Sequence, residues 1–459
     1  MSDVFGGKCS REIGFTLRVG GAGSNINDRR NWDSYLLDGE VVRIQPEHGL
    51  KMQGFPDDFL LPNSKREAMK QLGNSVAVDA VRACAESLIH HLGIIDSRNK
   101  RENIMTATRN KGEWIELYSF LKVILDKKLY LSDKNLKQTD DFFNVHKVST
   151  LNIQEEVSLT SEGFEIIRGK SHYSYDDNTI FNNNDIDYFK NAIQANNKTF
   201  SLDEIERIFK KIGINIINDG NSNQKADIIL DVSRNGQFFE NEGFGIKSYL
   251  GSNPTLLNAS GSNTNFIYEI KGFNDNLMVE TNAIHTRTKI KDRISNIISK
   301  GGSLEFSSIE AETMQYNLSV LDRDLPLIVS KMLLNAYLNR RNKLVDNLEN
   351  LYKSPEENMH DLIDLQGSMI KVKRLLLAIL LGLFSGKKWD GKFLANGTIV
   401  VKEDGSQVAF HITKKDLLED YLFNIIKFDT PSTTRHRFAS VYKERDGKFY
   451  FKLNLQLGF

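Results

Sequence analysis

The spacing of hydrophobic residues predicts helices in several parts of the chain. After residue 110, large apolar side chains recur at intervals of three and four residues, as they do on one face of a helix. That face consists of Trp114, Leu117, Tyr118, Leu121 and Leu125. Residues 201–212 show the same period, and Ser201 with Glu204 matches a capping box at the start of this second predicted helix. Two longer helical stretches are predicted at about 311–349 and 357–385.

Alternation of apolar and polar residues predicts strands elsewhere. Residues 225–250 are predicted to form a β-hairpin, with "KADIILDV" and "GFGIKSYL" as its strands and "SRNGQ" as its turn. The terminal "GKFYFKLNLQLGF" alternates in the same way. The run "LLLAILLGLF" at 375–384 is about half as long as a membrane span, so it indicates a buried helix. We therefore expect no membrane-spanning segment.

A polar stretch separates two segments of different composition. "DSRNKRENIMTATRN" at 96–110 follows a glycine-rich first segment and precedes the first helical pattern. We predict a first domain at 1–98, a linker at 99–109 and a second domain at 110–459. The length of 459 residues leaves ample chain for more than one buried core.

Charge and cysteine content narrow the class of protein. The chain has 60 basic and 60 acidic residues, so its formal net charge is zero and any DNA contact must come from local clusters. Cys9 and Cys84 are the two cysteines, which argues against a disulfide framework and a zinc site and indicates a reducing compartment. With no signal pattern at its start, the protein is expected in the cytoplasm.

Two blocks in the first segment carry a family resemblance. "VVRIQPEHGLKMQGFP" at 41–56 and "QLGNSVAV" at 71–78 resemble the C-terminal part of cytosine-5 DNA methyltransferases. In that family the first block supports the target-recognition region, and the last block packs against the methyl-donor pocket. The resemblance implies a small α+β segment formed from the end of such an enzyme.

The residues that perform methyl transfer are missing from this segment. The family attacks cytosine with a cysteine in a Pro-Cys pair, because a thiolate must add to the ring. Cys9 lies in "GKCS" and Cys84 lies in the predicted terminal helix, so neither has that context. "VGGAGS" at 19–24 is glycine-rich but stands too close to the recognition blocks to be the donor loop. Two interpretations remain open: a truncated relic that packs or contacts DNA, or one half of a split enzyme that complements a separate methyltransferase chain.

Asp227 and Lys247 are the candidate catalytic pair of the second segment. Each lies in one strand of the predicted hairpin. A lysine inside an apolar strand is costly unless an anionic group meets it. A carboxylate is a hard oxygen ligand for Mg²⁺, and a nearby ammonium can stabilise a phosphate or hold the attacking water. The pair therefore matches the nuclease core with a PD-(D/E)xK signature, a mixed α/β sheet flanked by helices.

The sequence departs from this signature at two positions. Ala226 replaces the proline, and Gly245 stands where the second carboxylate belongs, two residues before Lys247. Residues two apart in a strand share a face, so another acid must complete the ligand set. We prefer Glu116 on the first helix, keep Glu113 on nearly the same face as a reserve, and keep Glu269 in "NFIYEI" as a residue that an adjoining strand would supply.

Five blocks in one order resemble the HpaII family of type II restriction endonucleases over about residues 109–459. They are "NKGEWIELYSFLKVILDKKLY", "KADIILDV", the stretch from "GFGIKSYLGSNPTLLNAS" to "NFIYEI", "TPSTTRHRF" and "FYFKLNLQLGF". The resemblance implies a magnesium-dependent endonuclease that acts as a homodimer on double-stranded DNA, at CCGG. In this family a small residue precedes the Ile-Lys pair, so Gly245 fits it. The metal ligands expected on this basis are Asp227, Glu116 and Ile246.

Several polar residues are candidates for contacts to DNA. A basic helix at 288–300 suits phosphates, amides and hydroxyls after the second hairpin strand suit base edges, and the arginines of "PSTTRHRF" suit guanine. The candidates are Lys289, Lys291, Arg293, Ser248, Asn258, Asn263, Arg435 and Arg437. Each also has a simpler interpretation, as a solvated helix face or an ordinary polar loop.

Two functional classes remain. The chain is either an active endonuclease fused to a methyltransferase tail, or a DNA-binding subunit of a split methyltransferase whose nuclease has decayed. The intact pair Asp227 and Lys247 favours the first class, because decay removes metal ligands early. Taken singly, Asp227 could be a turn residue, Lys247 a charge that protects an edge strand, and Glu116 part of a solvated helix face.

Overall fold

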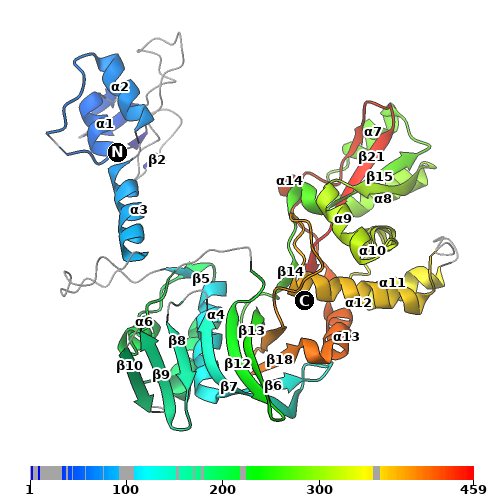
Figure 1. Ribbon diagram of the computed structural model, residues 1–459. Coiled ribbons are helices and arrows are strands. Elements are labelled where there is room, and N and C mark those ends of the chain that lie inside the picture. The colour runs from blue at the N-terminus through cyan, green and yellow to red at the C-terminus, as the bar shows by residue number, and fades with distance from the viewer. Residues whose placement is uncertain are drawn as a thin grey trace. The chain divides into compact units, whose positions relative to one another are not determined.

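The computed structural model describes most of the chain in two units. The described residues are 2–3, 9–10, 34–37, 40–43, 45–56, 58–75, 77–91, 108–150, 153, 155–168, 171–176, 180–217, 224–354 and 362–459. One unit is Met1–Met105 and the other is Thr106–Phe459. The linker predicted at 99–109 lies outside the described residues except for 108 and 109. Each unit is described by itself below (Figure 1).

The described residues of the first unit form a small antiparallel sheet and three helices. The sheet has the order β2-β1-β3-β4. Its strands are β1 (Ser2–Asp3), β2 (Cys9–Ser10), β3 (Ser34–Leu37) and β4 (Glu40–Arg43). The helices are α1 (Pro46–Met52), α2 (Lys65–Asn74) and α3 (Val78–His91). Leu50, Met69 and Leu72 form its small core, so the "QLGNS" block packs through the end of α2.

The main sheet of the second unit has the order β10-β9-β8-β7-β12-β13-β17-β18-β6. Its first five strands in sequence are β6 (Lys128–Ser132), β7 (Gln138–Thr150), β8 (Glu156–Leu159), β9 (Gly163–Arg168) and β10 (Ser171–Asp176). The others are β12 (Ile228–Arg234), β13 (Gln237–Ser248), β17 (Gly397–Val401) and β18 (Gln407–His411). The pairs β13–β17 and β18–β6 are parallel, whereas the remaining pairs are antiparallel. Because β6 also pairs with β7, six of the strands close into a ring. The predicted mixed α/β class is confirmed.

The predicted hairpin is confirmed as β12 and β13. Arg234 pairs with Gln237, and the two turn residues are Asn235 and Gly236. Their φ angles are 51° and 77°, the left-handed conformation that a two-residue hairpin turn requires and that Asn-Gly tolerates best. The turn therefore fixes the pairing register of β12 and β13. This register determines which residues lie opposite each other at the open end of the hairpin.

Helices pack against one side of this sheet. The predicted first helix is α4 (Lys111–Asp126), which buries Trp114, Leu117, Tyr118 and Leu121 as expected. It packs with α5 (Asn183–Ala195) and, through Phe120, against Phe209 of α6 (Asp203–Lys211). The short strands β5 (Arg109–Asn110) and β11 (Thr199–Phe200) pair beside α4. The capping box predicted at Ser201 is wrong, because α6 begins at Asp203 and its N-cap is Leu202.

A second group of strands and helices completes this unit. Its sheet has the order β16-β15-β21-β20, formed by β15 (Asn265–Lys271), β16 (Ser303–Ile309), β20 (Val441–Lys443) and β21 (Phe449–Asn454). Its helices are α7 (Asp275–Asn282), α8 (Lys289–Ser299), α9 (Glu312–Leu321) and α10 (Leu325–Asn339). A short helix, α14 (Thr433–His436), precedes β20. The predicted terminal strand is confirmed as β21, followed by β22 (Leu457–Gly458).

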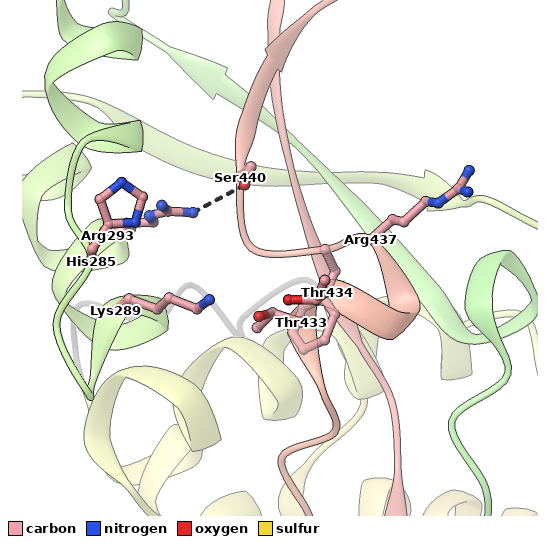
Figure 2. Close-up of a pocket in the computed structure, with 8 residues that line it drawn as sticks. His285, Lys289, Arg293, Thr433, Thr434, Arg437 and Ser440 are labelled. Carbon is pink, nitrogen blue, oxygen red and sulfur yellow. Dashed lines mark hydrogen bonds between the residues drawn. The ribbon is translucent and has the colours of Figure 1, made fainter. Parts of the chain in front are cut away.

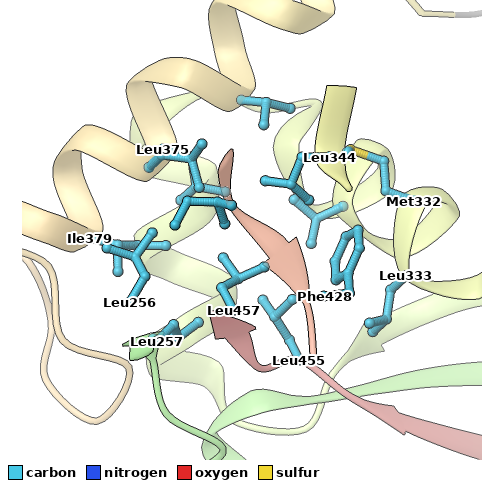
Figure 3. Close-up of a cluster of buried hydrophobic side chains, with 14 of the residues drawn as sticks. Leu256, Leu257, Met332, Leu333, Leu344, Leu375, Ile379, Phe428, Leu455 and Leu457 are labelled. Carbon is cyan, nitrogen blue, oxygen red and sulfur yellow. The ribbon is translucent and has the colours of Figure 1, made fainter. Parts of the chain in front are cut away.

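One continuous hydrophobic core joins the two groups. It includes Val400 and Phe410 in the main sheet and Phe266 and Phe451 in the second sheet. Figure 3 shows the part of it formed by the small sheet β14-β22-β19 and the surrounding helices. The elements that complete it are β14 (Thr255–Leu257), β19 (Lys427–Phe428), α11 (Leu344–Lys353), α12 (Leu365–Leu381) and α13 (Lys415–Ile425).

The long helical stretches are shorter in the structure than predicted. The stretch 311–349 is divided among α9, α10 and α11, since the chain leaves the helical conformation at Asp322 and turns left-handed at Arg340. The apolar run of the other stretch lies in α12, where Leu375 to Leu381 are buried. In the described part of the chain, none of the helices is long and apolar enough to cross a membrane.

Candidate active site

Asp227 lies at the open end of the hairpin and is held by both neighbouring strands. Its N–H donates to the Phe244 carbonyl at 2.9 Å, and its own carbonyl accepts from Thr150 Oγ1 of β7 at 2.9 Å. Its Oδ2 accepts from the Ile246 N–H of β13 at 2.6 Å. Main-chain groups of β13 and the Thr150 hydroxyl of β7 thus fix the backbone of Asp227, and the Ile246 N–H fixes its carboxylate.

Lys247 lies on β13 one residue after the contact to Asp227. Its Nζ donates to the Thr255 carbonyl at the start of β14, at 3.1 Å. Burial lowers the pKa of Lys247, and the Asp227 charge partly offsets that effect. Burial raises the pKa of Asp227, while the Ile246 N–H, Lys247 and Lys225 act in the opposite direction. The carboxyl and the ammonium therefore shift each other's pKa, and their assignment as a catalytic pair stays a prediction.

Lys225 is a third charged group at this place and was missed in the sequence. Its Nζ donates to the Ile379 carbonyl of α12 at 2.7 Å and lies 4.2 Å from the centre of the Phe384 ring. Burial, followed by repulsion from Lys247, lowers the pKa of Lys225 to about 8, against an opposing effect of Asp227. The signal was present in "KADIILDV", where a lysine stands two residues before the aspartate.

The structure explains the glycine at position 245. A Cβ on Gly245 would lie 2.8 Å from the Lys225 carbonyl oxygen and 3.9 Å from Asp227 Oδ2. A side chain here would thus point toward the Asp227 carboxylate but would first collide with the backbone at Lys225. Thr398 of β17 also donates to the Gly245 carbonyl at 2.9 Å, which holds the strand in this close approach. The second carboxylate of the wider signature has no room on this backbone.

Two of the other candidate acids have structural partners. Glu269 does not come from a strand that adjoins β13, so that expectation is wrong. It lies on β15 in the second sheet, where it forms ion pairs with Lys271 and Lys448. Glu113 closes a capping box with Asn110, since its carboxylate accepts from the Asn110 N–H at 2.8 Å and its N–H donates to Asn110 Oδ1 at 3.0 Å.

Glu116 is half-buried on α4, the helix that packs against β13 and β7. Within the described residues, no group of three His, Cys, Asp or Glu side chains gathers closely enough to hold a metal ion. Magnesium often binds through one or two carboxylates together with substrate phosphates and water. The donor set at Asp227 fits that form of site, in which bound DNA would supply further oxygen ligands.

The basic candidates for DNA contact lie around α14, in the second group of elements. A pocket of about 390 Å³ is lined by His285, Lys289, Arg293, Thr433, Thr434, Arg437, Phe438 and Ser440 (Figure 2). A second pocket of about 460 Å³ is lined by Gly261, Ser262, Asn265, Glu310, Arg435, His436, Arg437 and Lys452. Arg437 lines both, and the Arg435 and Arg437 side chains are exposed. These two arginines and Lys289 are candidates from the sequence, and the structure places all three at the two pockets around α14.

Arg293 and Ser248 are less accessible than a DNA contact requires. Arg293 is 5% exposed and donates to the carbonyls of Asn282, Ile284 and Ala439 and to Ser440 Oγ. These hydrogen bonds connect α8 to the segments on either side of the pocket and so stabilise its wall. Ser248 is 7% exposed and its Oγ accepts from the Leu250 N–H.

The remaining candidates differ in exposure. Asn258 is exposed, Lys291 is half-buried, and Asn263 donates to Ser260 Oγ at 3.1 Å. These three stay candidates for a contact to DNA.

Comparison with known proteins identifies relatives of both units. Residues 110–459 match the model of the HpaII restriction endonuclease family, and residues 22–90 match that of the C-5 cytosine-specific DNA methylases. The type II restriction enzyme HpaII of Haemophilus parainfluenzae is 33% identical over 362 residues, which cover 76% of this chain and 98% of that enzyme.

Similarity to methyltransferases is confined to short parts of those proteins. The methyltransferase M.HpaII of Haemophilus parainfluenzae is 38% identical over 92 residues, which cover 18% of this chain and 26% of that enzyme. M.SsoII of Shigella sonnei is 48% identical over 50 residues, which cover 11% and 13%. No solved structure gives a significant match. The chain thus spans about a quarter or less of these two methyltransferases.

Proposed function

The chain belongs to the HpaII restriction endonuclease family and is a type II site-specific endonuclease that carries a fragment of a cytosine-5 methylase in its first segment; from this premise we propose that it makes double-strand cuts at CCGG by metal-dependent phosphodiester hydrolysis. The observation that carries the proposal is the pair of Asp227 and Lys247 at the open end of the hairpin, coupled through Ile246. A buried carboxyl beside two lysines is suited to a phosphate and a cation.

The proposed site uses a magnesium ion with a PD-(D/E)xK type of core. Asp227 would hold the ion together with Glu116 and Ile246, whose side chain is apolar and whose carbonyl oxygen is therefore the donor. When bound, magnesium polarises the phosphate and lowers the pKa of an attacking water. Lys247 places an ammonium beside Asp227, where it stabilises negative charge on the phosphate or orients the water.

Two copies of the chain are proposed to act together on DNA. Each copy has one such site, so cutting both strands of a short symmetric sequence calls for a homodimer. The exposed arginines Arg435 and Arg437 are proposed to contact guanine, which CCGG supplies. Lys289, Lys291, Asn258 and Asn263 are proposed to add contacts to phosphates and bases.

Digestion of a plasmid of known sequence tests the proposal. The purified full-length chain with Mg²⁺ should produce the fragments expected from cutting at every CCGG, and chelation with EDTA should stop the reaction. A fragment pattern that corresponds to another sequence would overturn the proposed specificity. Cleavage of equal rate in EDTA would overturn the metal dependence.

A non-cleaving subunit of a split methyltransferase is the less favoured function. The match to the restriction enzyme extends over 98% of its length, which supports the endonuclease over this alternative. The first segment still shares the last blocks of the methylase family, and a separate methyltransferase chain remains a proposed partner.

A further inference from the structure

We propose that the pocket between α8 and α14 is a binding site for one phosphodiester of the DNA backbone, held by the Lys289 ammonium and the hydroxyls of Thr433 and Thr434. The inference rests on the proposed function and assigns a specific ligand to one part of the surface. It also separates this pocket, which fixes the position of DNA, from the neighbouring pocket that contains Arg435.

The chemistry of the lining points to a phosphate. The side chains that can donate include His285, Lys289, Thr433, Thr434 and Arg437. No carboxylate is found among the eight described residues that line this pocket. Cations combined with hydroxyl donors are the groups that contact phosphate oxygens in protein–DNA interfaces.

The directions of the side chains narrow the position of the phosphate. In Figure 2 the Lys289 ammonium points across the pocket toward the Thr433 and Thr434 hydroxyls. Arg437 extends away from these three groups. Asp292, on the same helix as Lys289, accepts hydrogen bonds from Thr286 and Thr288 and does not line the pocket. An anion between Lys289 and the two threonines therefore meets donors from two separate elements.

The pocket is rigid on the side of α14. The buried Arg293 donates to the Ala439 carbonyl and to Ser440 Oγ at 3.0 Å, and so ties the segment after α14 to α8. Arg437 and Ala439 have φ angles of 52° and 66°, a conformation that is strained for residues other than glycine. Asn282 further fixes Val441 through two hydrogen bonds, of 2.8 and 2.9 Å. A site built in advance in this way loses little conformational entropy when it binds a ligand.

The second pocket differs in a way that assigns it to another part of DNA. It contains Glu310, which pairs with Lys452 at 2.7 Å and accepts from Asn265 at 2.8 Å. A carboxylate repels phosphate but can accept from a cytosine amino group, and the adjacent arginines can donate to guanine. We therefore assign the phosphate contact to the first pocket and base contacts to the second, with Arg437 lining both.

Titration of a labelled duplex at several salt concentrations tests this assignment. The full-length chain is mixed, in EDTA to prevent cutting, with a duplex that has one CCGG site or with the same duplex changed at one base pair. Lys289→Met should weaken binding of both duplexes about tenfold. The slope of log affinity against log salt should become shallower by about 0.9, the value for one phosphate contact.

Three further variants make the result specific. Lys300→Met removes the same charge from the far end of α8, where Lys300 forms a surface ion pair with Glu280, and should change the affinity less than about twofold. Lys289→Arg should restore most of the affinity and the slope. Thr434→Val should weaken binding about fivefold without changing the slope, because a hydroxyl carries no charge. Equal circular dichroism melting curves would show that all variants are folded.

Two outcomes would overturn the phosphate site. One is an affinity and slope for Lys289→Met that equal those of Lys300→Met. Another is a change in the ratio between the two duplexes, since that would mean that Lys289 reads a base. Both differ from failure of the proposed function, in which the wild-type chain neither binds nor cuts the CCGG duplex.

Discussion

Asp227 and Lys247 are proposed to have different roles in cleavage, so we expect their variants to fail at the same step for different reasons. Asp227→Ala removes the carboxylate that would hold magnesium, and Lys247→Ala removes an ammonium beside the reacting phosphate. We expect each to lower the cleavage rate by a factor of about 100 or more while DNA binding in EDTA stays within a few fold. Single-turnover cleavage and fluorescence anisotropy measure the two quantities.

Asp231→Asn is the matched control for this pair. Asp231 lies on β12, the strand that follows Asp227, and its carboxylate accepts from the Asn241 N–H at 2.7 Å. It should cleave at close to the wild-type rate. Near wild-type cleavage by Asp227→Ala or Lys247→Ala would rule out the assignment of the catalytic pair.

Glu116 is the proposed source of the carboxylate that Gly245 cannot supply. Glu116→Gln keeps the size of the side chain and removes its charge, so cleavage should require a higher magnesium concentration, with most activity lost at low magnesium. Glu269→Gln is the comparison, because Glu269 is ion-paired in the other sheet and should leave the requirement unchanged. Magnesium titrations of the cleavage rate decide between them. A shift confined to the Glu269 variant would contradict this assignment.

Lys225 should make stability depend on pH in a predictable direction. Its folded-state pKa of about 8 lies below its ordinary value of 10.5, so between these values the unfolded chain binds more protons than the folded one. Stability contributed by this residue therefore rises as pH increases from about 8 to 10.5. We expect the melting temperature of the wild type, relative to Lys225→Gln, to rise across this interval. A difference that stays constant or falls would show that Lys225 is not buried as described.

At the scale of elements, the β12–β13 hairpin positions the proposed site, because the segment that leads into β12 lies close to β13 at Gly245. Gly245→Ala must move the backbone at Lys225, and we expect this to destabilise the second unit by about 1–3 kcal/mol and to reduce cleavage. Chemical denaturation and cleavage rates measure both effects. Gly386→Ala is the control for stability alone, because its Cβ would meet a side-chain atom, Asn263 Nδ2 at 3.3 Å, and no backbone atom within 4 Å. Wild-type stability of Gly245→Ala would mean that the close approach relaxes at little cost.

The same elements show what sequence can and cannot predict. Period and turn chemistry predicted α4, the hairpin with its Asn-Gly turn, and β21, because each of these is a local pattern. The placement of Glu269 was wrong, since β15 lies next to β21 and β16 through pairings that no local pattern specifies. Lys225 was overlooked because its burial depends on a contact with α12, which lies more than a hundred residues further along the chain.

At the scale of the whole molecule, the two units should be separable in function. The blocks of the restriction enzyme family begin at residue 110, after the boundary between the units at Met105. A chain that begins at residue 99 should therefore cut the same sites as the full-length chain. Circular dichroism would confirm that it is folded, and plasmid digestion would compare the fragments. A folded chain that cuts different sites would mean that the first segment takes part in recognition.

The first segment itself should transfer no methyl group. It matches the methylase family over residues 22–90, and its alignment with M.HpaII covers about a quarter of that enzyme. Neither Cys9 nor Cys84 follows a proline, as the nucleophile of that family does. We expect no label to pass from a labelled methyl donor to DNA when the purified chain is the only protein present. Incorporation by this chain alone would disprove the prediction. Incorporation that requires an added N-terminal methyltransferase fragment would instead establish a split enzyme, in which this chain supplies the recognition blocks and the nuclease cuts sites that its partner leaves unmethylated.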